Sequence, residues 1–281
     1  QLYLGLGYQY LGRFAADVNS NFQVGNSFSG VMLSGRMYLQ TQIPTYLNWQ
    51  GVFSDKKYTE SQSLFYEDIV PAMIKQKELY MKLKLGFPFL NHAKAEIGFA
   101  YGRLNDFYLQ STTIPFPNAS FDHSWYDLFS GSLSIEQNSL NTKQYPISGK
   151  QQFLIAQYVT GTEKYTPSPT SATTEAPIGR KVHSWLQLKG RWNQYQTLSN
   201  RFNLGYLAEM VISSKNLMNN YTASVLQAPA FTPTPHSEIV FNEAFRANQY
   251  VAFGLSPILK LSKLLHFRLD MYGFAPLYEI Q

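Results

Sequence analysis

The chain has 281 residues, with 23 Lys and Arg against 18 Asp and Glu, a net charge of +5 and no cysteine. The absence of cysteine excludes disulfides, thiolate zinc sites and cysteine nucleophiles, and the basic residues are scattered rather than clustered as in nucleic-acid binders. No apolar run reaches the roughly 18 residues of a membrane-spanning helix. The composition therefore excludes a helical membrane protein.

Alternating apolar and polar residues dominate the chain and predict β-strands. The alternation is weak at 3–11 and 15–24, clear at 31–40, and weak again at 45–54. It is strict at 79–89, where apolar residues such as Leu79 alternate with polar residues such as Lys82. The further segments, in chain order, are 95–102, 129–136, 150–162, 186–193, 201–212, 250–259 and 265–272. These segments predict about twelve strands.

Strand length points to a membrane protein. Soluble strands usually have about five or six residues, whereas a membrane-spanning strand needs roughly 9–11. Many of the predicted strands have that length, with one apolar face for lipid and one polar face for a lumen. We therefore expect residues 1–281 to form one domain, an antiparallel transmembrane β-barrel. The alternative is a soluble antiparallel sheet with one solvated face, which the long strands disfavour.

The connections between predicted strands differ in length. Short turns on one rim and long loops on the other are typical of outer-membrane barrels. The long loops are expected at 105–125, 163–179 and 213–246. The last is unusual because it combines apolar residues such as Phe231 with several prolines. Two alternatives stay open for it: an ordered loop packed in or over the lumen, and a surface loop docked on its neighbours.

Motifs that carry chemistry are missing from the chain. There is no G-x-S-x-G elbow and no dinucleotide or phosphate loop, so no catalytic, metal or cofactor site is expected. His183 is expected near an outward edge, but no matching serine pattern surrounds it. Charged residues on the polar faces either line a channel or form inward salt-bridge networks, and a narrow barrel filled by side chains favours the networks. These residues are Lys82, Lys84, Glu96, Arg103, Glu136, Lys189, Arg191, Arg201, Glu209, Arg268 and Asp270.

Three stretches resemble the C-terminal barrel of Bacteroidota patatin-like phospholipases: 144–149, which follows 136–141, then 228–236 and 245–250. That barrel is in turn similar to the outer-membrane assembly-factor and two-partner-secretion barrel superfamily. The resemblance implies a barrel of about sixteen strands, within the range of bacterial barrels, so the chain is expected to be partial. The superfamily has an arginine on a loop inserted in the lumen, and the resemblance assigns that part to Arg246.

The resemblance also sets the functional expectation. The patatin elbow and its Asp-Gly partner are absent from this chain, so any lipase domain is expected upstream of Gln1. We expect the membrane anchor or translocator barrel of a patatin-like surface protein, in contact with outer-membrane lipid of a Gram-negative bacterium. The alternatives are a structural subunit whose long loops bind other outer-membrane proteins, and a small-solute porin.

Overall fold

The computed structural model describes residues 2–26, 28–59, 73–90, 93–109, 120–169, 179–234, 237, 241–262, 265–278 and 280. Its strands form one antiparallel sheet of 13 strands. They are β1 (Leu2–Leu11), β2 (Ala15–Val24), β3 (Phe28–Leu39), β4 (Thr45–Thr59), β5 (Met73–Phe89), β6 (Ala93–Tyr108), β7 (Asp122–Asn138), β8 (Gly149–Thr166), β9 (Gly179–Thr197), β10 (Phe202–Ser213), β11 (Tyr250–Lys260), β12 (His266–Arg268) and β13 (Met271–Pro276). The antiparallel strands expected from the alternation are confirmed.

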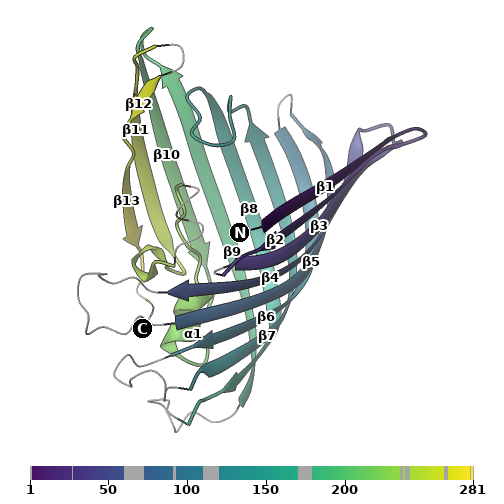
Figure 1. The fold of residues 1–281 in the computed structure, drawn as a ribbon, viewed down its shortest axis with the longest axis vertical. Helices are drawn as coiled ribbons and strands as arrows, with labels where there is room; N and C mark the ends of the chain where they lie inside the picture. Colours follow the sequence, from purple (N-terminus) through teal and green to yellow (C-terminus); the bar gives the residue numbers. More distant parts are fainter. Residues whose placement is uncertain are drawn as a thin grey trace.

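The strands follow one another in chain order from β1 to β12, and β13 also pairs with β11. Figure 1 shows the sheet curling round an interior, with the short helix α1 (Tyr221–Leu226) on its inner side. Within the described residues the ladder is linear, because no pairing joins β1 to β12 or β13. The described strands therefore form a curved wall with a free edge on β1.

The two faces of the wall have opposite chemistry. In β5, Leu79 and Met81 on one face are 53% and 69% exposed. On the other face of the same strand, Ile74 and Gln76 are buried. In β6, Glu96 and Asp106 are buried on the inward face. Apolar side chains thus lie outside and charged side chains inside, which is the arrangement of a barrel wall in lipid. A soluble sheet with one solvated face would show the reverse.

The last predicted strand, 265–272, is divided in the structure into β12 and β13. Both pair with β11 in one continuous register, with Ile258 opposite Arg268 and Leu255 opposite Met271. Between them, Leu269 N donates to Pro257 O at 3.1 Å. Pro257 has no N–H to return that bond, so the ladder weakens at this point. This division accounts for 13 strands where the sequence predicts about twelve.

Long and short connections alternate from β3 onward. The strand ends that flank residues 40–44, 90–92, 198–201 and 261–265 lie at one end of the wall, and the strand ends that flank 60–72, 109–121, 167–178 and 214–249 lie at the other. The expected loop bounds are partly wrong. β6 continues to Tyr108 and β7 begins at Asp122, so the loop predicted at 105–125 is shorter.

The other two loop predictions need similar corrections. β8 continues to Thr166, which shortens the loop predicted at 163–179, and the loop predicted at 213–246 extends to 249 because β11 begins at Tyr250. The two shortened loops have one cause, because polar residues such as Asn105 and Lys164 interrupt the apolar outward face near these strand ends and the periodicity fades there. Residues 110–119, 170–178, 235, 236 and 238–240 of these loops lie outside the described part of the chain.

The connection from β10 to β11, residues 214–249, is called the inner segment here. It contains α1 and a 3-10 turn, η2 (Glu243–Phe245), each begun by an asparagine cap: Asn220 Oδ1 accepts from Ala223 N at 2.8 Å, and Asn242 Oδ1 accepts from Ala244 N at 3.1 Å. Such caps satisfy helix donors that have no partner within the helix. None of the helices in the described ranges is long and apolar enough to span a membrane.

Candidate functional site: the inner segment and its wall contacts

The inner segment packs against the inward face of the wall. Ala223 and Leu226 of α1, with Met218, join a buried cluster that contains wall residues such as Tyr126 and Trp185. A second cluster surrounds Phe231, which is 2% exposed. Its wall members are Leu207, Val211, Tyr250 and Ala252, with Tyr272 and Phe274 packed against them. Of the two alternatives for this loop, the ordered one packed on the inner side is confirmed.

Arg246 lies within the inner segment, between η2 and β11. Its Nη1 donates to the carbonyl oxygens of Leu226 at 2.9 Å and Ala228 at 3.2 Å. Its guanidinium carbon lies 4.7 Å from the ring centroid of Phe241. These contacts connect the end of α1 to the part of the same segment that leads into β11. The resemblance assigns to Arg246 the part of the superfamily's arginine on a loop inserted in the lumen, and this role stays a prediction.

The part of the inner segment that follows α1 also pairs through its backbone with the part that precedes β11. Ala230 and Arg246 form an isolated antiparallel bridge, Phe231 N donates to Phe245 O at 2.9 Å, and Ala247 N donates to Pro229 O at 3.2 Å. Described residues from two of the three stretches that carry the resemblance, 229–231 and 245–247, therefore lie side by side.

A buried carboxylate in β8 holds the start of the inner segment. Glu163 is 0% exposed, and its Oε2 lies 2.7 Å from Nε2 of His183 on β9. Its oxygens also accept the Tyr126 hydroxyl at 3.2 Å and the backbone N–H of Asn219 at 3.1 Å. The prediction that His183 lies near an outward edge is wrong, because it is buried on the inward face. Its ring pairs with a carboxylate there and is unavailable to the outer surface.

A second carboxylate, Asp106 of β6, binds the end of α1. Gln227 Nε2 donates to Asp106 Oδ2 at 2.7 Å, and Gln76 of β5 donates to Oδ1 at 3.1 Å. Nearby, Asn220 Nδ2 donates to the Tyr108 hydroxyl at 2.7 Å. Polar contacts with β6 and β8 therefore accompany the apolar cluster, and together they hold the segment against the wall.

Lys215 occupies an apolar position at the base of the inner segment. Its Nζ lies 2.5 Å from Gln227 O and 4.9 Å from the ring centroid of Trp185. Burial removes the ammonium from water and lowers the pKa of Lys215 to about 7. The charges of Asp106 and Glu163 oppose this shift, and Arg246 adds to it.

A third buried carboxylate, Glu209 of β10, pairs with two cations of the wall. Its Oε1 lies 3.0 Å from Lys189 Nζ, and its Oε2 lies 2.5 Å from Arg191 Nε. Arg191 also donates from Nη2 to Thr232 O of the inner segment at 3.1 Å. The inward networks expected from the sequence are present here, and the same is true of Glu96, which pairs with Lys84 at 2.9 Å.

Two of the expected lumen charges are placed elsewhere. Arg103 lies on the outward face and pairs with Asp127 at 2.8 Å, with 60% and 54% of the two side chains exposed. It follows Phe99 and Tyr101 on the same face of β6 and lies directly opposite Leu79 of β5. Arg201 belongs to the turn between β9 and β10. The prediction that these two residues face the lumen is wrong.

The turn between β7 and β8 covers the interior at the opposite end. Arg268 of β12 donates from Nη1 to Pro146 O at 2.9 Å and from Nη2 to the Tyr195 hydroxyl at 3.0 Å. Asn203 of β10 donates from Nδ2 to Ile147 O at 2.6 Å. The turn closes through Gly149, whose φ of +94° favours glycine. The remaining stretch of the resemblance, 144–149, is therefore also bound on the inner side.

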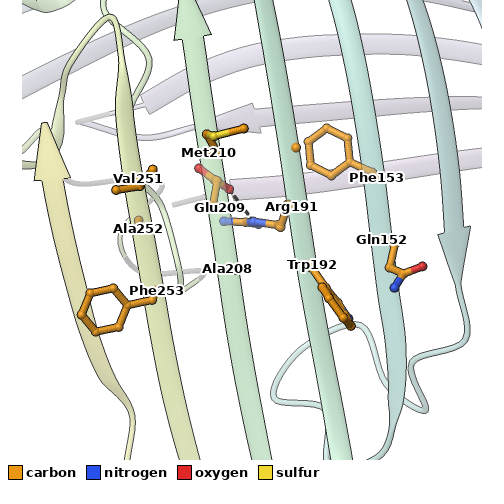
Figure 2. A pocket seen from close by; sticks show the side chains of 11 residues that line it. Gln152, Phe153, Arg191, Trp192, Ala208, Glu209, Met210, Val251, Ala252 and Phe253 are labelled. Atoms are coloured by element: carbon orange, nitrogen blue, oxygen red, sulfur yellow. Dashed lines mark ion pairs between the residues drawn. The ribbon is translucent and has the colours of Figure 1, made fainter. Parts of the chain in front are cut away.

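The outward face carries an apolar groove of about 510 Å³ across β8 to β11. Figure 2 shows Trp192, Met210, Val251 and Phe253 round it, with the Arg191–Glu209 ion pair in the same wall. The small residues Gly190 and Ala208 contribute to its lining. Trp192 Nε1 donates to Gln194 Oε1 at 3.2 Å, which suits an aromatic residue at a membrane boundary. The groove offers no reactive group to the outside.

Within the described ranges, no three His, Asp or Glu side chains are grouped so as to hold a metal ion. The polar groups of the interior instead bind one another and the inner segment. Their arrangement can hold a segment in place inside the wall.

The comparisons with known proteins agree with this fold. No protein-family model matches the chain, and no curated protein matches it. Among solved structures, it is similar to BamA from Haemophilus ducreyi, solved without POTRA domains 1–3, with a TM-score of 0.60 and 13% identity. The match covers 98% of this chain and 57% of the BamA chain, so this chain spans little more than half of that neighbour's length. At this identity the likeness concerns the fold, which is an antiparallel β-barrel of the outer-membrane type.

Sequence reasoning did not identify Glu163 and Asp106 as anchors of the inner segment. Both fall inside stretches predicted as loops, 163–179 and 105–125. A signal was nevertheless present, because each is followed two residues later by a tyrosine, Tyr165 and Tyr108, on the same face of a strand. An acid and a tyrosine at that spacing indicate a strand that continues with a buried polar face.

Proposed function

We propose that this chain is the outer-membrane barrel that anchors a patatin-like surface protein, or assists its translocation, in a Gram-negative bacterium. The described strands supply most of a barrel of about sixteen strands. No reaction is assigned to these residues, and an enzymatic domain of the whole protein lies outside them.

The observation that carries the proposal is the inner segment bound inside the wall. A porin keeps a water-filled lumen, whereas here two apolar clusters and the buried carboxylates of Glu163 and Asp106 hold a long connection against the inward face of the wall. An anchor needs a stable barrel without an open pore. Described residues of two stretches that resemble the patatin-like barrels, 228–234 and 245–250, belong to these inward contacts or directly follow them, which supports that family over an unrelated barrel.

One observation favours the alternative of a structural subunit that binds other outer-membrane proteins, called the scaffold. The long connections at 60–72, 109–121, 167–178 and 214–249 share one end of the wall, where another outer-membrane protein can meet them. The porin alternative is weaker, because the inner segment occupies the inward face.

The test is the composition of the native polypeptide. Its intact mass and a peptide map upstream of Gln1 should show a heavier protein with a G-x-S-x-G peptide, and membrane fractions should carry lipase activity that depends on that serine. A native polypeptide without such a domain would contradict the anchor function. Stable co-purification of other outer-membrane proteins would then favour the scaffold.

A further inference from the structure

The outward face of β4 and β5 gathers three lysines around one carboxylate. Lys57, Lys75 and Lys77 share this face with Asp55, because their chain neighbours Ser54, Ile74 and Gln76 are buried on the inward face. Lys57 lies directly opposite Lys75, and Asp55 lies directly opposite Lys77. The three lysines and Asp55 are called the lysine patch below.

The lysine patch is electrostatically unbalanced. Asp55 Oδ2 lies 3.8 Å from Lys75 Nζ and 3.9 Å from Lys77 Nζ, distances too long for hydrogen bonds. Within the described residues, Lys57 joins no ion pair. Like charges directly opposite each other in a sheet are destabilising, so the wall keeps the Lys57–Lys75 pair at a cost. An anion between the ammonium groups would remove that cost.

The position of the patch along the strands identifies the anion. The next outward residues toward the middle of the wall are Phe53 and Leu79, 46% and 53% exposed, which begin the apolar stretch of β4 and β5. The patch therefore lies at the polar limit of the apolar face, on the side of the long connections. In a barrel that spans a membrane, lipid headgroups lie at this level.

We propose that Lys57, Lys75 and Lys77 bind the phosphate groups of lipids in the leaflet nearest the long connections. Lysine binds phosphate as a point charge, and basic residues at an anionic membrane surface each add to binding. Asp55 lies near the ammonium groups of Lys75 and Lys77. Its single negative charge leaves the patch with a net positive charge that attracts an anionic ligand. This inference rests on the proposed location in the outer membrane, and it adds a lipid class to it.

The experiment uses the purified full-length native protein in nanodiscs of phosphatidylcholine, with and without diphosphorylated lipid A. The lipid A retained per protein and its dissociation constant are measured for the wild type and for the triple variant Lys57→Gln, Lys75→Gln, Lys77→Gln. We expect roughly 100-fold weaker binding by the triple variant, from three basic side chains at a charged surface. In discs without lipid A, the variant should unfold at the same or a higher temperature, because the Lys57–Lys75 repulsion is gone.

A matched control comes from β8 and β9, where Lys164 and Arg180 also lie directly opposite each other. Two further outward residues, Thr160 and Thr162, separate Lys164 from the apolar Tyr158. The double variant Lys164→Gln, Arg180→Gln should therefore bind lipid A as the wild type does. Equal losses in both variants, or no loss in the triple variant, would overturn the inference while leaving the barrel in place. Failure of the wild type to enter any disc would instead contradict the proposed function.

Discussion

Tyr250, the first residue of β11, directs its hydroxyl to the Glu209 carboxylate of β10 at 2.6 Å, and the same hydroxyl lies 3.3 Å from Ala230 O in the inner segment. The carboxylate also neutralises Lys189 and Arg191. One phenol thus joins the charge network of the wall to the segment that the wall holds.

Replacing Glu209 should therefore be among the most damaging single changes in the wall. Glu209→Gln removes a buried charge that two partly buried cations share, and such a loss costs about 3–5 kcal/mol. Tyr250→Phe removes only a hydrogen bond to a charged group, which costs about 1.5–3 kcal/mol. Urea unfolding in detergent micelles measures both. Arg103→Gln, which breaks an exposed pair on the outward face, is the control and should leave the unfolding midpoint unchanged.

The assignment of faces can be tested at two adjacent residues of β9. Leu188→Arg places a charge on the outward apolar face and should cost about 2–4 kcal/mol if that face meets lipid near the midplane. Gln187→Arg places the same side chain on the inward face and should cost little. Folding yield into phosphatidylcholine vesicles compares the two. Equal yields would mean that the outward face does not meet lipid.

Phe231 should control release of the inner segment. Its ring is buried among Tyr250, Tyr272 and Phe274, and Phe231→Ala should cost about 3–5 kcal/mol of packing. We expect the variant to show faster proteolysis within 214–249 and larger conductance in planar bilayers, while the strands stay folded. Leu217→Ala removes an exposed side chain of the same segment and should change neither measurement. A pore that stays equally closed in both variants would contradict a blocking role for the segment.

Docking of the inner segment should strengthen as pH rises from about 7. The Lys215 pKa is about 7 in the docked state, against about 10.4 for a free lysine. Between these values the undocked segment binds more protons, so docking becomes more favourable with rising pH. Protease cleavage of the segment should accordingly slow from neutral to alkaline pH. Lys215→Met should abolish this dependence, and a variant with the wild-type pH profile would rule out Lys215 as its origin.

The sequence predicts the wall well because period-two alternation is strong wherever one side of a strand is apolar. It predicts the strand ends poorly, as at Asp106 and Glu163, because polar residues such as Asn105 and Lys164 interrupt the apolar outward face there. The resemblance predicts a lumen-loop role for Arg246, whereas its partners in the structure, Leu226 O and Ala228 O, come from the fold of the segment itself. Local patterns carry no information on contacts between distant parts of a loop.

The inner segment begins directly after β10 and ends directly before β11, and these two strands are paired neighbours. Its two attachment points therefore stay together whether it is docked or not. Fully extended, its residues span about 120 Å, which is ample for the loop to leave the interior while its ends remain fixed. Exit and return are thus a first-order process within one molecule, with a rate independent of protein concentration, and the occupied state re-forms without a search for a partner.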